Sequence, residues 1–311
     1  MKQTVIAIVG PTAIGKTKLS IEVAKKFNGE IISGDSMQVY KNMDIGTAKV
    51  TKEEMQGISH YMIDTKEPSE AYSVADFQRD VQASIKKIAS HQKIPIIVGG
   101  SGLYIQAALY NYNFSNHKRD QQITEQLEKY VNKEGINPLF ERLKEIDPEQ
   151  AAKIHPNNHR RVIRALEIYE TTGTTMTAYQ QNQNSESPYK VLFIGLEMDR
   201  SLLYNRINKR IDLMMEKGLL KEVKSLYEQG LENCQSMKAI GYKEFLPYFK
   251  GEQDLDRAIE LLKRNSRRYA KRQYTWFKNK MDIHWYTIAA CSIDESFQTI
   301  LKDLAGLLKE K

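Results

Sequence analysis

Short apolar runs alternate with amphipathic stretches over the first hundred residues of this 311-residue chain. Residues 5–9, 30–33 and 94–98 have the length and the β-branched content of buried strands. After the first run, apolar side chains recur at helical spacing from residue 17 onward. Because strands and helices alternate, the pattern predicts a parallel sheet built from crossover units, in the α/β class.

The composition changes after this first part. Residues 111–120 are polar, and from residue 121 to about residue 179 the chain is charged, amphipathic and helix-prone. A polar low-complexity stretch then precedes another buried strand at 191–196. We therefore expect a core of residues 1–115 and 189–311, interrupted by a helical insertion at 116–188. In the rest of the core we expect helices over most of 200–280, a strand at 283–286 and a final amphipathic helix.

A phosphate-binding loop follows the first predicted strand. The pattern is G-x-x-x-x-G-K-[ST], formed by Gly10, Pro11, Thr12, Ala13, Ile14, Gly15, Lys16 and Thr17. The glycines allow backbone N–H groups to surround phosphate oxygens, and the helix start adds partial positive charge. Lys16 would reach the terminal phosphates, and the Thr17 hydroxyl would hold Mg²⁺. The sequence thus predicts a P-loop NTPase-like core that binds a di- or triphosphate.

One carboxylate is a candidate for chemistry beside this loop. The strand at 94–98 ends in Gly99-Gly100-Ser101-Gly102, without the aspartate that organises water in many phosphate-loop hydrolases. Asp35, which follows the strand at 30–33, is instead placed to face bound phosphates as a base. A cap on the turn that follows explains Asp35 equally well, and the strand context leaves both interpretations open.

Charge and cysteine content limit the class of protein. The formal net charge is +7 and the pI is about 9.0, which favours a polyanionic partner but leaves RNA, DNA and acidic membranes open. The two cysteines are far apart and no Cys/His cluster has zinc spacing, which indicates a reducing compartment. The apolar start ends at Gly10-Pro11, and no stretch reaches membrane-spanning length. We expect a cytoplasmic protein.

Basic residues gather in two further places. One is His159-Arg160-Arg161-Val162-Ile163-Arg164 in the insertion, and the other is a late helix on which Arg264, Arg268 and Arg272 share one edge. Few acidic residues accompany these arginines, so contact with phosphates is favoured over a merely solvated face. On the same helix, Tyr269, Tyr274 and Trp276 are most simply core residues.

Two other patterns are ambiguous or misleading. Arg206 and Arg210 fall on one helical edge, either on a plain surface helix or as a clamp on a diphosphate. Asn279-Lys280-Met281-Asp282 matches the guanine-reading element of GTPases, but the only D-x-x-G match, at residues 303–306, comes after it. Because this order is reversed, we interpret the match as a coincidence.

Together these segments closely resemble the tRNA dimethylallyltransferase family, also called tRNA isopentenyltransferase, over nearly the whole length. The resemblance is carried by the phosphate loop and by segments 35–41, 43–49, 98–104, 160–167, 240–242 and 271–277. It implies transfer of a dimethylallyl group from dimethylallyl diphosphate to N6 of adenosine 37 in tRNA, with diphosphate bound where relatives of the fold hold nucleotide. We expect the short bacterial type, acting as a monomer.

The resemblance also implies roles for residues. Asp35 would accept the N6 proton, while Lys16, Mg²⁺ on Thr17, and Arg206 or Arg210 would neutralise the leaving diphosphate. The target base would be flipped out of its loop into the pocket. The anticodon stem-loop would meet Asp35, Ser36, Met37, Gln38, Ser101, Ile123, His159, Arg160, Arg161, Val162 and Ile163, besides the three arginines of the late helix.

The chain departs from the family pattern at two positions. Ser101 replaces the usual threonine and keeps the hydroxyl. Where many members carry an RNA-contacting arginine at the start of the insertion, this chain has Ile123, with Arg119 nearby. The competing hypotheses are a free-nucleotide isopentenyltransferase of the same fold, an ATP-dependent nucleotide or RNA kinase, and a non-catalytic RNA-binding module. The basic segments argue against the first, and the intact Lys16-Thr17 pair against the last.

Overall fold

The chain folds into two compact units. The computed structural model describes residues 2–112, 114, 120–181, 186–289 and 292–309. The core unit comprises Met1–Tyr110 and Ser187–Lys311, and the inserted unit comprises Asn111–Glu186. The insertion expected at 116–188 covers almost the same stretch. Each unit has its own hydrophobic cluster, so each is described by itself.

A six-stranded parallel sheet forms the centre of the core unit, in the order β3-β2-β4-β1-β5-β6. Its strands are β1 (Thr4–Val9), β2 (Gly29–Ser33), β3 (His60–Tyr61), β4 (Ile94–Gly99), β5 (Lys190–Glu197) and β6 (His284–Thr287). All five predicted strands are present, and among the described residues the two-residue β3 is the one strand that was not expected. Val9 lies opposite Gly99, so the phosphate loop and the glycine-rich turn leave the sheet side by side.

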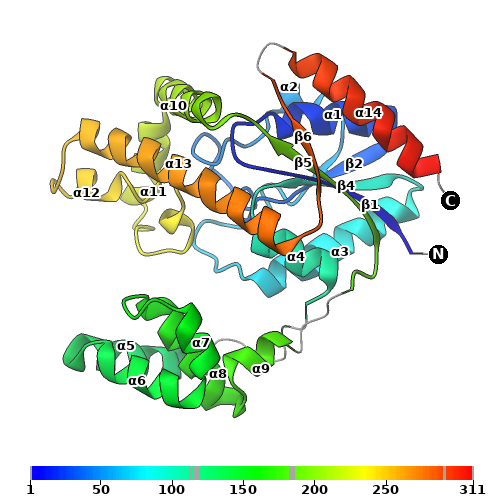
Figure 1. The fold of residues 1–311 in the computed structure, drawn as a ribbon. Coiled ribbons are helices and arrows are strands. Elements are labelled where there is room, and N and C mark those ends of the chain that lie inside the picture. The colour runs from blue at the N-terminus through cyan, green and yellow to red at the C-terminus, as the bar shows by residue number, and fades with distance from the viewer. Residues whose placement is uncertain (1, 113, 115–119, 182–185, 290–291, 310–311) are drawn as a thin grey trace. The chain divides into compact units, whose positions relative to one another are not determined.

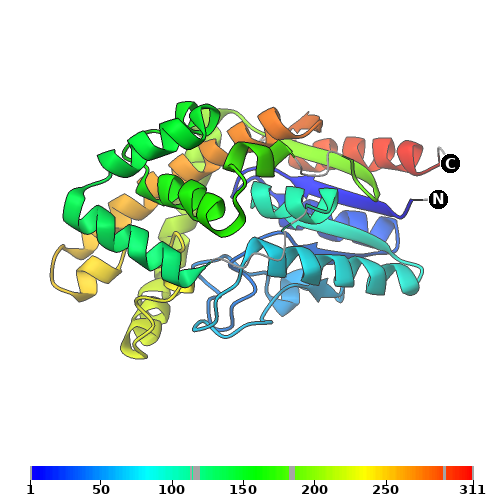
Figure 2. The same ribbon diagram turned by 90° about the horizontal axis from the view of Figure 1, so that it is seen from below.

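Helices cover both faces of this sheet, which confirms the predicted α/β class (Figures 1 and 2). One face carries α1 (Lys16–Lys26) and α14 (Ile293–Lys309), and the other carries α3 (Val74–Ser90) and α4 (Gly102–Tyr110). Ser73 and Asp76 form a capping box at the start of α3. From there the apolar face of α3 buries Phe77, Val81 and Ile85 against the core.

Four further helices of the core unit lie toward the carboxyl ends of the strands (Figure 1). They are α10 (Arg200–Glu216), α11 (Leu219–Glu228), α12 (Leu246–Phe249) and α13 (Leu255–Lys280), with a 3₁₀ turn at Ser236–Lys238, whereas the short α2 (Lys52–Met55) lies beside α1. Aspartates cap the first turns of α10 and α13, at Asp199 and Asp254. In open α/β sheets this end of the strands is where ligands bind.

The inserted unit is a helical bundle, as the sequence predicts. Its helices are α5 (Gln121–Glu134), α6 (Asn137–Ile146), α7 (Pro148–Lys153), α8 (His159–Thr172) and α9 (Met176–Gln181). They enclose a small apolar core that includes Leu127, Leu143 and Leu166. Asp147, 4% exposed, caps α7 and accepts hydrogen bonds from Thr177 at the start of α9. That buried carboxylate therefore ties the two short helices together.

No helix among the described residues is both long enough and apolar enough to cross a lipid bilayer.

Candidate active site

The phosphate loop adopts the wrapped conformation that its sequence requires. Gly10, Ala13 and Gly15 have φ values of 146°, 64° and 109°. A Cβ atom on Gly10 would lie 2.7 Å from the carbonyl oxygen of Leu196 on β5, so only glycine fits there. The loop ends at Lys16, where α1 begins. Strand, loop and helix thus follow one another as predicted.

Lys16 is held inside this loop. Its Nζ donates hydrogen bonds to the carbonyl oxygens of Gly10, at 3.0 Å, and Pro11, at 2.7 Å. Burial is the largest cause that lowers the pKa of Lys16, to about 7, and the nearby charge of Arg210 lowers it further. The Asp35 carboxylate acts in the opposite sense. Part of the Lys16 side chain still lines a cavity beside the loop. An anion in the loop would stabilise the charged ammonium.

Two arginines on α10 contact the same loop. The Nε of Arg206 donates to the carbonyl oxygen of Ala13, at 2.9 Å, and a terminal nitrogen of Arg210 donates to the Thr12 hydroxyl, at 3.5 Å. Both side chains are thus turned toward the loop, and the clamp on a diphosphate stays a prediction. The four-residue spacing places both guanidinium groups along one edge, beside the position where a phosphate would bind.

Two cavities meet at the phosphate loop. The larger, about 850 Å³, lies among α1, residues 44–56 and α10, and its lining combines cationic and acidic side chains with apolar ones such as Ile21 and Met214. The smaller, about 110 Å³, contains Asp35. Both are lined by Lys16, Thr17, Ala48 and Arg210. A ligand on the loop would therefore be accessible from both cavities.

Asp35 both caps a turn and lines the smaller cavity. Its Oδ1 accepts the N–H of Met37 at 2.9 Å, which is the capping role. Burial raises the pKa of the Asp35 carboxyl, against the opposing effects of the Met37 N–H, Lys16 and Arg210. A desolvated carboxylate of raised pKa is a stronger base than an exposed one, so the two interpretations of Asp35 are compatible.

The other predicted residues around Asp35 differ in position. Gln38 lines the smaller cavity, but its amide is engaged by the protein, accepting from Ser33 Oγ and donating to the carbonyl oxygens of Thr47 and Ala48. Ser36 and Ser101 are each 8% exposed. The N–H of Ser36 points to Ser101 Oγ at 3.4 Å, and Met37 packs partly against the core. Contacts of these side chains with a base remain predictions.

Two residues of α13 that the sequence did not assign to the site also lie there. Tyr269, expected to be a core residue, lines the smaller cavity and hydrogen-bonds with the side chains of Ser101 and Gln273. Gln273 lines it too. The expectation for Tyr269 is therefore corrected, whereas Tyr274 and Trp276 are partly buried against the core as expected. Only the four-residue spacing of Tyr269 and Gln273, away from the arginine edge, could have suggested them.

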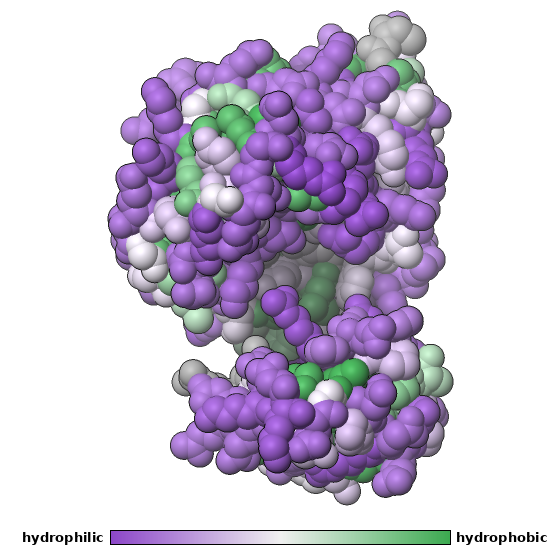
Figure 3. Space-filling model, turned by 90° about the vertical axis from the view of Figure 1, so that its left-hand side faces the viewer, coloured by the Kyte–Doolittle hydropathy of each residue, from purple (hydrophilic) through white to green (hydrophobic). Residues whose placement is uncertain are grey.

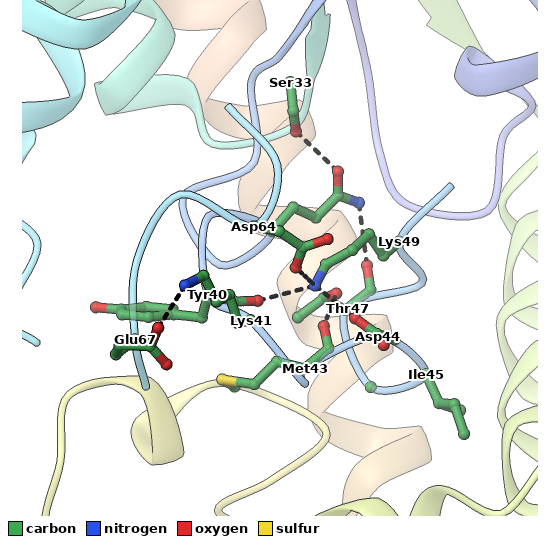
Figure 4. Close-up of polar contacts among 12 residues, drawn as sticks. Ser33, Tyr40, Lys41, Met43, Asp44, Ile45, Thr47, Lys49, Asp64 and Glu67 are labelled. Carbon is green, nitrogen blue, oxygen red and sulfur yellow. Dashed lines mark hydrogen bonds and ion pairs between the residues drawn. The ribbon is translucent and has the colours of Figure 1, made fainter. Parts of the chain in front are cut away.

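The segment 43–49, which contributes to both cavities, is fixed by polar contacts (Figure 4). Lys49, whose side chain is 5% exposed, bonds to the Tyr40 carbonyl oxygen and to the carboxylates of Asp44 and Asp64. Glu222 on α11 accepts the N–H groups of residues 44, 45 and 46. Glu222 also accepts the hydroxyl of Tyr242, whose ring lies against Gly46. The motifs at residues 43–49 and 240–242 are thus in contact beside the cavities.

The basic residues of α13 are not uniformly exposed. Arg268 and Arg272 are exposed, but Arg264 is half-buried, and its buried Nε has no hydrogen-bond partner among the described residues. Figure 3 views the core unit from the side on which α10 to α12 lie, and this face is mostly hydrophilic. Two of the three arginines predicted on one basic edge are therefore exposed, and contact of the three with RNA phosphates stays a prediction.

In the inserted unit, the predicted RNA-contacting stretch is divided by burial. His159, Arg160 and Arg161 are exposed on the first turn of α8. Val162 and Ile163 are 0% and 4% exposed and belong to the apolar core, so the prediction that their side chains contact RNA is corrected. The side chain of Ile123 packs against the same core. Arg119 lies outside the described residues.

Comparisons with known proteins agree with the fold. A model of the IPP transferase family, described as "IPP transferase", matches residues 38–280. The tRNA dimethylallyltransferase of Oceanobacillus iheyensis is 61% identical over 311 residues, covering 100% of this chain and 99% of the relative. The enzyme of the same name from Bacillus pumilus is 54% identical over 308 residues, covering 99% and 97%.

Solved structures are also similar. The full-length tRNA isopentenylpyrophosphate transferase from Bacillus halodurans has a TM-score of 0.76 and 49% identity, covering 100% of this chain and 98% of that one. A eukaryotic dimethylallyltransferase acting on tRNA has a TM-score of 0.82 and 34% identity, covering 96% and 77%. The resemblance inferred from the motifs is confirmed, and the chain belongs to the IPP transferase family of prenyltransferase enzymes.

Proposed function

We propose that this protein transfers the dimethylallyl group of dimethylallyl diphosphate to N6 of adenosine 37 in tRNA. The bond between the allylic carbon and the diphosphate oxygen breaks, a carbon–N6 bond forms, and the N6 proton leaves to a base. Relatives 54% and 61% identical carry the name tRNA dimethylallyltransferase, which supports the substrate pair. The proposal depends most on one observation, the junction of two cavities at the phosphate loop with a carboxylate in one of them.

Asp35 is the proposed base. An adenine amine is a weak nucleophile because its lone pair is delocalised into the ring, so removal of its proton assists attack. Asp35 lines the smaller cavity, and burial raises its pKa, which suits a proton acceptor. The acceptor base would therefore present N6 through the smaller cavity, while the prenyl donor would occupy the larger one. The apolar side chains of the larger cavity suit a hydrocarbon group.

The leaving diphosphate would be stabilised by cations already in place. Lys16 lies in the loop, and Arg206 and Arg210 contact it from α10. As the allylic C–O bond breaks, negative charge grows on the diphosphate, and these positioned groups favour the transition state over the bound substrate. Thus both arginines, rather than one of the two, are proposed to act on the diphosphate.

Mg²⁺ fits this site only as a partner of the diphosphate. Among the described residues no group of three His, Cys, Asp or Glu side chains could enclose a metal ion. Mg²⁺ commonly keeps several waters and binds through one or two protein oxygens plus substrate phosphates, so a single protein ligand suffices. The hydroxyl of Thr17, an exposed residue that lines both cavities, is the proposed ligand. When bound, the ion would neutralise diphosphate charge.

The RNA would be held by exposed basic side chains. Arg268 and Arg272 on α13 are available in the core unit, and His159, Arg160 and Arg161 are available in the inserted unit. Such side chains contact backbone phosphates and position the nucleic acid without reading its sequence. A base that reacts at its amino group must leave the stack of its loop to enter the cavity. We propose that both units contact the anticodon stem-loop.

The alternative to the proposed tRNA enzyme is a free-nucleotide isopentenyltransferase of the same fold. It would share the phosphate loop and Asp35 but would have no use for basic residues on a separate helical unit. A stem-loop carrying adenosine 37 is therefore expected to be modified, whereas AMP is not. Equal turnover of AMP and the stem-loop would overturn the proposal in favour of the alternative.

The direct test uses radiolabelled dimethylallyl diphosphate, Mg²⁺ and unmodified tRNA. Label is expected to appear in the RNA, at N6 of adenosine 37 after digestion to nucleosides. Transfer should need all three components. Rapid hydrolysis of ATP or GTP, together with no transfer from the prenyl donor, would contradict the proposed function and point to a kinase or ATPase.

A further inference from the structure

Gln273 connects α13 to the phosphate loop and to the glycine-rich turn. Its side chain is buried, and the residue is 5% exposed. The Oε1 atom accepts the N–H of Thr12 at 3.0 Å, and the Nε2 atom donates to the carbonyl oxygen of Gly100 at 3.1 Å. One amide therefore spans two loops that leave neighbouring strands β1 and β4. The contact with Thr12 joins residues 261 positions apart in the sequence.

The glycine-rich turn is shaped around this amide. A Cβ atom on Gly100 would lie 2.0 Å from Gln273 Nε2 and 3.2 Å from the carbonyl oxygen of Gly10. Any larger residue at position 100 would displace the amide from the phosphate loop. Glycine is thus required at position 100 because the Gln273 amide occupies the space that a side chain would need, and not because of the backbone conformation.

Thr12 is the point at which two helices hold the phosphate loop. Its N–H is bound by Gln273 on α13, and its hydroxyl is approached by Arg210 on α10 at 3.5 Å. The next residue, Ala13, has a positive φ of 64°, a conformation that costs energy and persists only where the surroundings impose it. Because the Thr12 N–H donates to Gln273, it points away from the phosphate position. This contact fixes the orientation of the other N–H groups of the loop, which are left to bind a phosphate.

We propose that Gln273 is a positioning residue of the diphosphate site, which sets the conformation of the phosphate loop without touching the reacting atoms. The inference deepens the proposed function and rests on it only in that the loop receives a diphosphate. Loss of the amide leaves the Thr12 N–H and the Gly100 carbonyl without this partner, and the loop relaxes away from the shape that fits the ligand. RNA contacts on the exposed side of α13 are unaffected.

The test measures binding of inorganic diphosphate with Mg²⁺ by calorimetry to the full-length protein. Gln273→Met keeps the length of the side chain but removes its hydrogen bonds to Thr12, Gly100 and Tyr269, and we expect affinity to fall about tenfold or more. Affinity for an anticodon stem-loop should stay within about twofold. In transfer assays the KM for the prenyl donor should rise, while kcat changes less than about threefold. Asn279→Ala, which removes an exposed amide from the end of the same helix, is the matched control and should match the parent.

Two further variants separate positioning from general damage to the fold. Gln273→Asn keeps the amide but is too short to reach both loops, and Gly100→Ala displaces the amide from the other side. Both should show the same selective loss, and Gly100→Ala combined with Gln273→Met should bind no worse than the weaker single variant, because both break one bridge. Parent-like diphosphate affinity in Gln273→Met, or an equal loss of RNA affinity, would overturn the inference. A parent protein that fails to bind diphosphate would instead contradict the proposed function.

Discussion

The ammonium of Lys16 is an acid whose strength depends on the ligand. With its pKa lowered to about 7 by burial and Arg210, Lys16 is only partly charged near neutral pH. A bound diphosphate raises that pKa, so binding above pH 7 takes up a proton, and affinity falls by up to about tenfold per pH unit until the pKa of the complex is reached. Below the free pKa the lysine is charged in both states and adds no pH dependence.

Comparison with Lys16→Arg isolates this effect. Arginine stays charged throughout, so the variant should lose the part of the pH dependence that comes from Lys16. Affinity for inorganic diphosphate, measured from about pH 6 to about pH 9, should fall more steeply for the parent than for Lys16→Arg, because the ionisation of diphosphate itself contributes equally to both. Parallel profiles would show that Lys16 is fully charged in the free protein.

Asp35 is the second residue whose protonation is decisive. Asp35→Asn preserves the shape and the Met37 contact but cannot accept a proton, so transfer at saturating substrates should slow by about 10²-fold or more, with binding changed only a few-fold. In the parent, transfer should rise with pH as Asp35 ionises, at a higher pH than for an exposed aspartate, because burial raises its pKa. Single-turnover kinetics measure both effects. A rate within threefold of the parent would remove Asp35 from the mechanism.

At the scale of elements, the wall formed by segment 43–49 depends on α11. Glu222 accepts three consecutive N–H groups, of Asp44 at 2.9 Å, Ile45 at 2.8 Å and Gly46 at 3.0 Å. Glu222→Gln replaces one acceptor oxygen by an NH₂ group that faces a donor. The segment should loosen, and the KM for the prenyl donor should rise about fivefold, with kcat within about twofold. Steady-state kinetics should show no change for the control Glu228→Gln, an exposed position on α11.

Helix α13 has one side that faces the site and one exposed side that we propose contacts RNA. Arg268→Gln and Arg272→Gln should each remove one phosphate contact, so that RNA affinity falls and the slope of log affinity against log salt flattens by about one unit. Transfer at saturating RNA should change little, since neither residue lines the cavities. Filter binding at several salt concentrations makes the measurement, with Lys302→Gln on the exposed side of α14 as control. An unchanged slope in both arginine variants would place the RNA elsewhere.

The two units of the molecule have separate cores, which permits them to be separated. The chain leaves and re-enters the core unit at adjacent points, because Ser187 Oγ donates to the carbonyl oxygen of Leu109 at 2.6 Å. A short Gly/Ser linker in place of residues 111–186 should therefore close without strain. The shortened protein should fold cooperatively and bind inorganic diphosphate within about threefold of the parent, while RNA affinity falls about tenfold or more. Thermal unfolding and calorimetry decide between this result and a core that needs the insertion to fold.

The sequence determined by itself the features whose causes are local. Glycines at fixed offsets, a lysine and a hydroxyl between a strand and a helix specify the phosphate loop, because positive φ values and N–H direction depend on adjacent residues. Five strands and the inserted helices follow from side-chain periodicity and composition. Seven short motifs in the same order as in the family were enough to identify the family from the sequence. The two-residue β3 escaped because it is too short to have a period.

Only the tertiary structure decided which distant residues share the site. Thr12 and Gln273 are 261 positions apart, and Gly46 and Glu222 are 176 apart, and no local pattern pairs them. Helical periodicity placed Tyr269 on a buried face. It could not distinguish a face packed in the core from a face that lines a cavity, since both kinds of face carry apolar residues. A run of basic residues likewise hid the burial of Val162 and Ile163, because the residues of one run point to different faces of a helix. These positions are decided by packing between elements, and that packing depends on the whole fold and not on any local stretch of sequence.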